Sequence, residues 1–317
     1  MSYCTIPLDQ RQIIYDKVFS LKQNGLSYKK IIEQILSEFR IKLHKSTLSY
    51  WFNNNVKLVG GENYFNSIAS PELSYVLGVM FGDGAITFNK KKQDYAIRLE
   101  AKDKDFVENF STCVSKVLNK NRNYLVCKTK REMYSVKGRS KQLYYFIKSL
   151  KEDFELLKKF VEPFPAEFIR GVLDSEGTIS ASPKKYLKLR VYIASSANLE
   201  LLKYLRDLLF RNFMIKTILS KTKTAGMIDS VIDGRVIRRT KDLFQLAAVN
   251  EEQAILCCEL IGSAISRKIK KFEDFIFLRK RYTRLEAAIL WQKIYHKEGR
   301  FWIRNNTKSI DSFLITY

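Results

Sequence analysis

The sequence predicts an α+β protein with two pseudo-symmetric αββαββα repeats, each carrying an antiparallel sheet, preceded by an all-α helix-turn-helix domain. Three patterns support this prediction. A glycine-bearing apolar motif occurs twice, 93 positions apart, at Gly78 and Gly171. Strand and helix patterns follow both copies in the same order, and the first 55 residues show helical periodicity alone.

We expect five segments along the chain. They are a helix-turn-helix domain at 1–55, a linker at 56–72, a first repeat at 73–162, a second repeat at 163–271 and a helical, basic C-terminal extension at 272–317. The linker is placed around residues 53–63, NNNVKLVGGEN, because this stretch is polar and contains two glycines.

The N-terminal domain is predicted from three amphipathic segments. Residues 8–24 place apolar side chains at helical spacing and stop at Gly25. A second helix is expected after Ser27 and a third after Ser46, because serine is a favourable N-cap residue. This order of helices is typical of a helix-turn-helix domain, and a small bundle for protein contacts is the alternative interpretation.

The two repeats are predicted from matching segments. The stretch YVLGVMFGDGAI at 75–86 is echoed by FIRGVLDSEGTI at 168–179. Each is followed by a strand of period two and an amphipathic helix, at 95–110 and 187–202, and then by two further strands and a helix. Inside the second repeat, an Asp-Gly pair in VIDGRVI at 231–237 indicates an extra hairpin.

Composition limits the partners. There are 56 Lys and Arg against 33 Asp and Glu, a net charge of +23, which favours polyanions and nucleic acid above all. No apolar run approaches the roughly 18 residues that span a bilayer, and no signal peptide is recognised. We therefore expect an intracellular protein, in the cytoplasm or an organelle matrix, that is not secreted and binds no membrane.

Few residue types remain for chemistry. The five cysteines show neither zinc-type spacing nor an even disulfide framework, and there are only two histidines. A site built on histidine is therefore not expected. Any chemistry must depend on carboxylates, lysine, arginine or tyrosine.

Two acids stand out because each lies where the helix dipole disfavours a negative charge. We expect the first motif to form a helix that ends at Gly84 as a left-handed cap, with Asp83 at its C-terminal end; Glu176 precedes Gly177 in the same way. A carboxylate there is disfavoured by up to about 1 kcal/mol, because the helix macrodipole is negative at that end. Glycines four residues apart let two such helices approach closely, which brings the acids together.

Two adjacent carboxylates repel each other unless one is protonated or a cation lies between them. Only oxygen ligands are available, so we expect Mg²⁺ with retained waters, and Mn²⁺ as a substitute. The expected ligands are the carboxylates of Asp83 and Glu176 and the carbonyls of Gly82 and Ser175. A divalent ion of this kind can activate water for attack on phosphorus.

The paired motifs resemble those of the LAGLIDADG homing endonucleases in their single-chain, two-motif form, over about residues 70–270. The resemblance implies that Asp83 and Glu176, each before the last glycine of its motif, bind the catalytic Mg²⁺. It also implies that the two sheets form a DNA-binding saddle over the major groove, and that both strands are cut to leave 3′ overhangs.

The sequence departs from the family pattern in two places. The earlier acid of the motif is present as Asp174 but is replaced by Phe81 in the first repeat. The family often places a basic residue at the end of the last strand of a repeat, which implies a catalytic role for Lys137 in charge stabilisation or water activation. The matching position in the second repeat is Ala248, so basic assistance there is missing or comes from elsewhere.

The DNA-binding residues are expected in three groups. The third N-terminal helix would contact base edges, strand residues that alternate with inward ones would face the groove, and a lysine loop at 89–92 would hold phosphate. They are Lys45, Thr47, Ser49 and Tyr50 on the helix, Arg98, Glu100, Lys102, Lys188, Arg190 and Tyr192 on the strands, and Lys90, Lys91 and Lys92 in the loop.

These inferences lead to one function and two alternatives. We expect a site-specific, Mg²⁺-dependent double-strand DNA endonuclease of the intron-homing type, acting as a monomer with internal two-fold pseudo-symmetry. An intron RNA maturase would use the same scaffold on RNA, and a regulator would bind DNA without cleaving it. With no catalytic Cys or Ser at residue 1 and no terminal His-Asn, an intact intein is not expected.

Overall fold

A computed structural model describes residues 8–53, 65, 67–91, 94–232, 235–299 and 301–305 of the protein. The chain forms two compact units, Met1–Tyr64 and Phe65–Tyr317. The predicted phosphate contact Lys92 lies outside the described residues.

The first unit contains α1 (Leu8–Gln23), α2 (Tyr28–Phe39) and α3 (Lys45–Asn53). The Ser27 side chain caps α2 by accepting from the Lys30 N–H, as the sequence predicts. The helix α3 begins at Lys45, so Ser46 lies inside the first turn and the predicted cap is wrong. Apolar side chains from the three helices form a separate core: Ile14, Val18, Ile31, Ile35, Leu48 and Trp51.

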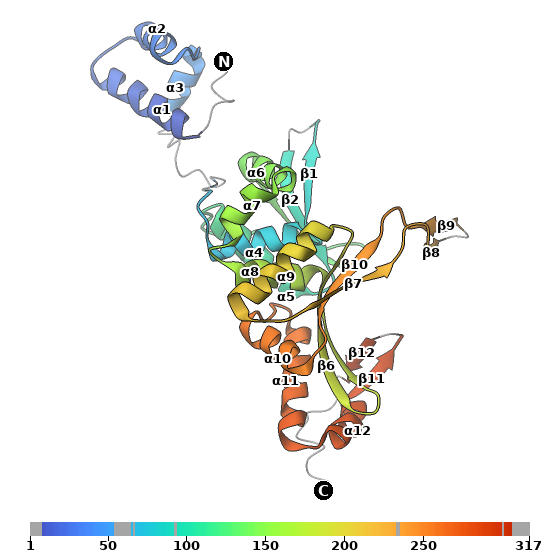
Figure 1. Cartoon of the computed structure of the whole chain (residues 1–317). Coiled ribbons are helices and arrows are strands. Elements are labelled where there is room, and N and C mark those ends of the chain that lie inside the picture. The colour runs from blue at the N-terminus through green and yellow to red at the C-terminus, as the bar shows by residue number, and fades with distance from the viewer. Residues whose placement is uncertain are drawn as a thin grey trace. The chain divides into compact units, whose positions relative to one another are not determined.

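The second unit contains the two predicted repeats (Figure 1). The first comprises α4 (Pro71–Met80), β1 (Ala85–Asn89), β2 (Asp94–Ala101), α5 (Lys104–Val117), β3 (Cys127–Lys128), β4 (Tyr134–Arg139) and α6 (Lys141–Glu152), followed by α7 (Phe154–Val161). The second comprises α8 (Pro165–Glu176), β5 (Thr178–Pro183), β6 (Leu187–Ser196), α9 (Leu199–Phe213), β7 (Ile218–Lys223), β10 (Leu243–Ala248) and α10 (Glu251–Leu260).

The two sheets have matching strand orders, which confirms the predicted pseudo-symmetry. The order is β1-β2-β4-β3 in the first and β5-β6-β10-β7 in the second, and their strand pairs are antiparallel. Alternate residues of β2 and β6 are buried in one core that both repeats share, including Leu99 and Val191. The intervening Arg98 and Arg190 are exposed, so each sheet keeps one polar face.

An additional hairpin lies between β7 and β10 in the chain. Its strands are β8 (Ile228–Ile232) and β9 (Arg235–Arg238), and they form a separate two-stranded sheet beyond the ends of β7 and β10 (Figure 1). This is the hairpin that the Asp-Gly signal predicts. In the first repeat, the strands β3 and β4 are joined directly, through residues 129–133.

The C-terminal part differs from the prediction of a purely helical extension. It contains α11 (Ser266–Arg281) and α12 (Arg284–Ile294), and then the hairpin of β11 (Tyr295–Glu298) and β12 (Phe301–Arg304). The predicted boundary at 271/272 falls inside α11. The buried Asp274 of α11 is tied to the hairpin: the Tyr295 hydroxyl and the Arg304 Nε each donate to its Oδ2, at 2.8 Å. None of the helices formed by the described residues is long and apolar enough to cross a membrane.

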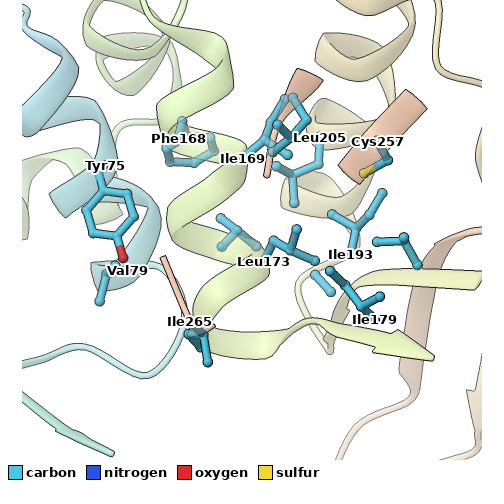
Figure 2. Packing of buried hydrophobic residues seen from close by; sticks show 14 of the residues in the cluster. Tyr75, Val79, Phe168, Ile169, Leu173, Ile179, Ile193, Leu205, Cys257 and Ile265 are labelled. Carbon is cyan, nitrogen blue, oxygen red and sulfur yellow. The ribbon is translucent and has the colours of Figure 1, made fainter. Parts of the chain in front are cut away.

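The helices α4 and α8 are in backbone contact at Gly78 and Gly171. A Cβ atom on Gly78 would lie 2.2 Å from the Phe168 carbonyl oxygen, and one on Gly171 would lie 2.4 Å from the Tyr75 carbonyl oxygen. Figure 2 shows Tyr75 and Val79 on α4 across from Phe168 and α8. Only glycine fits at these positions, because the obstacle is backbone, which cannot rotate away.

We expect Gly78→Ala to destabilise the second unit by about 2–3 kcal/mol, the usual cost of overpacking a tight core contact. The sign is informative, because alanine in an unconstrained helix is about 1 kcal/mol more favourable than glycine. The measurement is chemical denaturation followed by fluorescence and circular dichroism. A variant as stable as the parent protein would contradict the backbone contact.

Candidate metal and nucleic-acid site

The two predicted acids lie at or just after the ends of the paired helices, but the local geometry differs from the prediction. The helix α4 ends at Met80, and Asp83 lies in the turn that follows it. Gly84 is not left-handed, so the predicted cap is wrong. A Cβ there would lie 2.9 Å from the Val79 carbonyl oxygen, so close packing explains this glycine. Glu176 is the last residue of α8.

The structure brings the predicted ligand positions together. A Cβ on Gly82 would lie 2.5 Å from the Ser175 Cβ and 3.2 Å from the Glu176 Cγ. Burial raises the pKa of Glu176, and the negative charge of Asp83 raises it further. The pKa of Asp83 is raised by burial, against a lowering by the positive charge of Lys268. Both side chains are exposed, so solvent weakens the repulsion that the two carboxylates exert on each other when both are ionised.

This donor set fits a hard divalent cation. Two carboxylates near two backbone carbonyls offer oxygen ligands alone, which suits Mg²⁺ or Mn²⁺ and leaves positions for water or phosphate. Within the described ranges, no three His, Cys, Asp or Glu side chains gather in a group that could hold a metal ion.

Asp174, the earlier acid of the second motif, is buried and joins three elements. Its Oδ2 accepts from the Tyr75 hydroxyl of α4 at 2.9 Å and from the Ala264 N–H at 3.0 Å, and its Oδ1 accepts from Ser263. In the first repeat the equivalent residue, Phe81, packs against the Phe168 ring, with the centroids 6.2 Å apart. Hydrogen bonds tie one helix end in place, and ring packing does so at the other.

Lys268 is a site residue that the sequence prediction missed. It lies on α11, is only 3% exposed, and donates to the carbonyl oxygens of Leu173 at 2.7 Å and Asp174 at 3.1 Å. Burial lowers its pKa to about 8, against the raising effect of the negative charge of Asp174. The surrounding sequence, SRKIKK, has the composition of a run of solvent-exposed lysines. The helical spacing of Lys268 from the buried Ile265 and Phe275 was the available signal.

Lys137 lies on β4 and contacts a carboxylate of the neighbouring strand. Its Nζ donates to the Asp94 Oδ2 at 2.5 Å, and Arg139 pairs with the same carboxylate at 3.3 Å. The equivalent position, Ala248, is fully buried. A catalytic role for Lys137 stays a prediction that its contacts do not favour.

The predicted nucleic-acid contacts lie in both units. In the second unit, Lys188 and Arg190 are exposed on β6 and stand opposite Ser182 and Ser180 of β5, while Tyr192 is half-buried. Arg98 of β2 is exposed and pairs with the half-buried Glu100; the exposed residues Lys102, Lys90 and Lys91 lie in turns. In the first unit, Lys45 and Tyr50 on α3 are exposed, and Thr47 and Ser49 are half-buried.

The acids should lower stability when no cation is present. A carboxyl whose pKa is raised by folding stabilises the protein below its unfolded pKa of about 4, and this contribution is lost as the pH rises through the folded pKa. At pH 7 in EDTA we therefore expect Asp83→Asn or Glu176→Gln to raise the melting temperature by about 1–3 °C, a small effect because both groups retain access to solvent.

Differential scanning calorimetry with EDTA and then Mg²⁺ measures this effect. Mg²⁺ should stabilise the parent protein more than either variant, since a ligand that binds only the folded state raises its stability. Variants that melt below the parent protein in EDTA would contradict the repulsion.

Known proteins share this sequence pattern. Residues 163–262 match the family model of the LAGLIDADG-like domain. The uncharacterized protein MJ0398 of Methanocaldococcus jannaschii is 31% identical over 272 residues, which cover 85% of this chain and 96% of that protein. A second uncharacterized protein of that organism, MJ0314, is 34% identical over 169 residues, covering 52% of this chain and 61% of its own.

Solved structures with a similar fold include the LAGLIDADG meganuclease I-AabMI bound to uncleaved DNA, at 15% identity and a TM-score of 0.46, covering 73% of this chain and 99% of that one. Another is I-DmoI in complex with DNA and Mn, at 19% identity and a TM-score of 0.41, covering 62% and 98%. The matched domain is the second repeat, and the first repeats its motif and strand order. The chain belongs to the LAGLIDADG family, in the form that carries two motifs in one polypeptide.

Proposed function

We propose that the protein is a site-specific, Mg²⁺-dependent endonuclease that cuts both strands of duplex DNA and leaves 3′ overhangs, as a homing endonuclease does. One observation carries the proposal: Gly82, which precedes Asp83, is packed against Ser175 and Glu176, so the two chain segments that carry the acids meet. A protein that only binds DNA has no use for the repulsion between these acids.

Each part of the chain has a task in this proposal. The glycine contact between α4 and α8 fixes the acids, and their carboxylates, with the carbonyls of Gly82 and Ser175, would hold Mg²⁺. When bound, a divalent cation supplies a Lewis acid for the phosphoryl oxygens and for water activation. The exposed basic residues on β2 and β6 bind phosphate and place the scissile bonds over the acids.

The first unit adds contacts to DNA beyond the cleavage core. Its α3 presents Lys45 and Tyr50 to solvent, as a recognition helix would. The net charge of +23 implies many phosphate contacts, so affinity falls steeply with salt. We propose that the segments at 1–55, 73–162 and 163–271 divide the work in this way, with one chain acting as a monomer.

Neutralising either acid should abolish cutting without weakening DNA binding. We expect Asp83→Asn and Glu176→Gln to lower the single-turnover cleavage rate at least about 100-fold, because each removes stabilisation of transition-state charge. Cleavage of a randomised DNA library in Mg²⁺ is the measurement, with affinity measured in Ca²⁺. Asp207→Asn is the matched control, since Asp207 is exposed on α9 and pairs with Arg211.

The outcomes separate the candidate functions. Binding by the parent protein without metal-dependent cutting would overturn the proposal and indicate a regulator. Tight binding of intron RNA with assisted splicing, in place of DNA cleavage, would indicate a maturase.

Removal of residues 1–60 should weaken DNA binding and shorten the footprint, because the first unit is a separate compact body with its own core. The cleavage rate on saturating DNA should stay within about threefold, since the acids belong to the second unit and distant sites act independently. Footprinting and single-turnover kinetics test this division. A truncated protein that binds as before but no longer cuts would refute it.

A further inference from the structure

The first turn of α11 lies just outside the segment that matches the family model, which ends at residue 262. It nevertheless contacts both repeats. Three consecutive residues of this turn, Ser266, Arg267 and Lys268, bond to groups that are 94 to 164 positions away in the sequence. Such long-range contacts, made by one turn, hold distant parts of the chain together.

On the side of the second repeat, the contact is made by a buried charge. The Lys268 ammonium donates to two carbonyls in the last turn of α8, directly before Ser175 and Glu176. The Leu173 carbonyl also accepts from the Gly177 N–H that caps α8, and a cation at these carbonyls opposes the negative end of the macrodipole. Lysine is almost never fully buried unless it is paired, so the charge has a specific use at this place.

The loop that leads into α11 reinforces this contact. The Ala264 N–H and the Ser263 hydroxyl both donate to the buried carboxylate of Asp174, which also accepts from Tyr75 of α4. The end of α8 is thus held from two directions, by a cation on its carbonyls and by donors on its side chain.

On the side of the first repeat, the contacts are made to the start of α5. The Arg267 guanidinium donates two hydrogen bonds to the Asp103 carboxylate, at 2.6 and 2.7 Å, and the Ser266 N–H donates to the Asp105 Oδ2 at 2.5 Å. A bidentate pair of this kind fixes orientation as well as distance. Asp103 lies two residues after the end of β2 and is the N-cap residue of α5, so the turn is tied to the first repeat at the junction of its sheet and helix.

We propose that the first turn of α11 is a clamp that sets the position of Glu176 relative to Asp83, and that Lys268 is its positioning residue. The clamp joins the end of α8 to the first repeat. The residues of α11 that form it lie outside both motifs. The effect of the clamp on cleavage depends on the proposed endonuclease function, but its effect on geometry does not.

The test of geometry uses cysteines at the two acid positions. In a protein carrying Asp83→Cys and Glu176→Cys, disulfide formation in a fixed redox buffer reports how often the two positions meet, and mass spectrometry distinguishes this bond from those of the native cysteines. Disulfides require narrow geometry, so we expect Lys268→Met to slow the reaction at least about threefold. Lys271→Met is the control: it lies one turn further along α11, where burial and the charge of Arg267 lower its pKa to about 8.

The test of catalysis uses the full chain with native acids. We expect Lys268→Met to lower the single-turnover rate on saturating DNA about 10- to 100-fold, as small misplacements of reacting groups do, with the Kd for DNA within about twofold. Lys268→Arg should recover most of the rate. Arg267→Gln, which breaks the exposed side of the clamp, should slow both cutting and cross-linking and remains informative if Lys268→Met does not fold.

Equal cross-linking rates in the parent protein and in the Lys268→Met and Arg267→Gln variants would overturn the clamp. A loss of cleavage that weaker DNA binding fully explains would also overturn the clamp. If the parent protein does not cut DNA but the variants slow cross-linking, the clamp stands and the proposed function fails.

Discussion

The backbone contact between α4 and α8 at Gly78 and Gly171 is the constraint on which the rest of the second unit depends. Two helices without side chains at their crossing approach closely enough for a carbonyl oxygen of one to meet the α-carbon of the other. This contact aligns the two repeats, so that their sheets carry exposed basic residues at equivalent positions. It also brings the two chain segments that carry the acids to one place.

That alignment creates an electrostatic problem that the fold only partly solves. Both helices direct the negative ends of their dipoles toward the same region, where Asp83 and Glu176 add two carboxylates. Lys268 opposes this charge from inside the protein, and Asp174 is satisfied by three donors from α4 and from the loop before α11. The pKa values of both carboxyl groups are raised nonetheless. A cation from solvent that binds between them would relieve the remaining repulsion.

The sequence alone was sufficient for features that depend on local pattern. Repetition of the motif predicted both repeats, and period-two alternation placed Leu99 and Val191 inside and Arg98 and Arg190 outside. Glycine spacing predicted the helix pair. The convergence of Gly82, Ser175 and Glu176 followed from the same spacing.

Features that depend on distant contacts were missed or misassigned. Gly84 is required by packing against α4 and not by a left-handed turn, which sequence spacing cannot distinguish. Lys268 reaches the end of α8 from α11, a contact between residues about 95 positions apart that no local pattern indicates. The β11–β12 hairpin has strands of four residues, too short for alternation to be recognised.

The central claim is that one divalent cation reconciles the two acids, and anomalous diffraction from a crystal soaked in Mn²⁺ tests it most directly. We predict an anomalous peak between Asp83 and Glu176, with both carboxylates turned toward it. A crystal without such a peak, in which the two carboxylates point apart, would contradict the account.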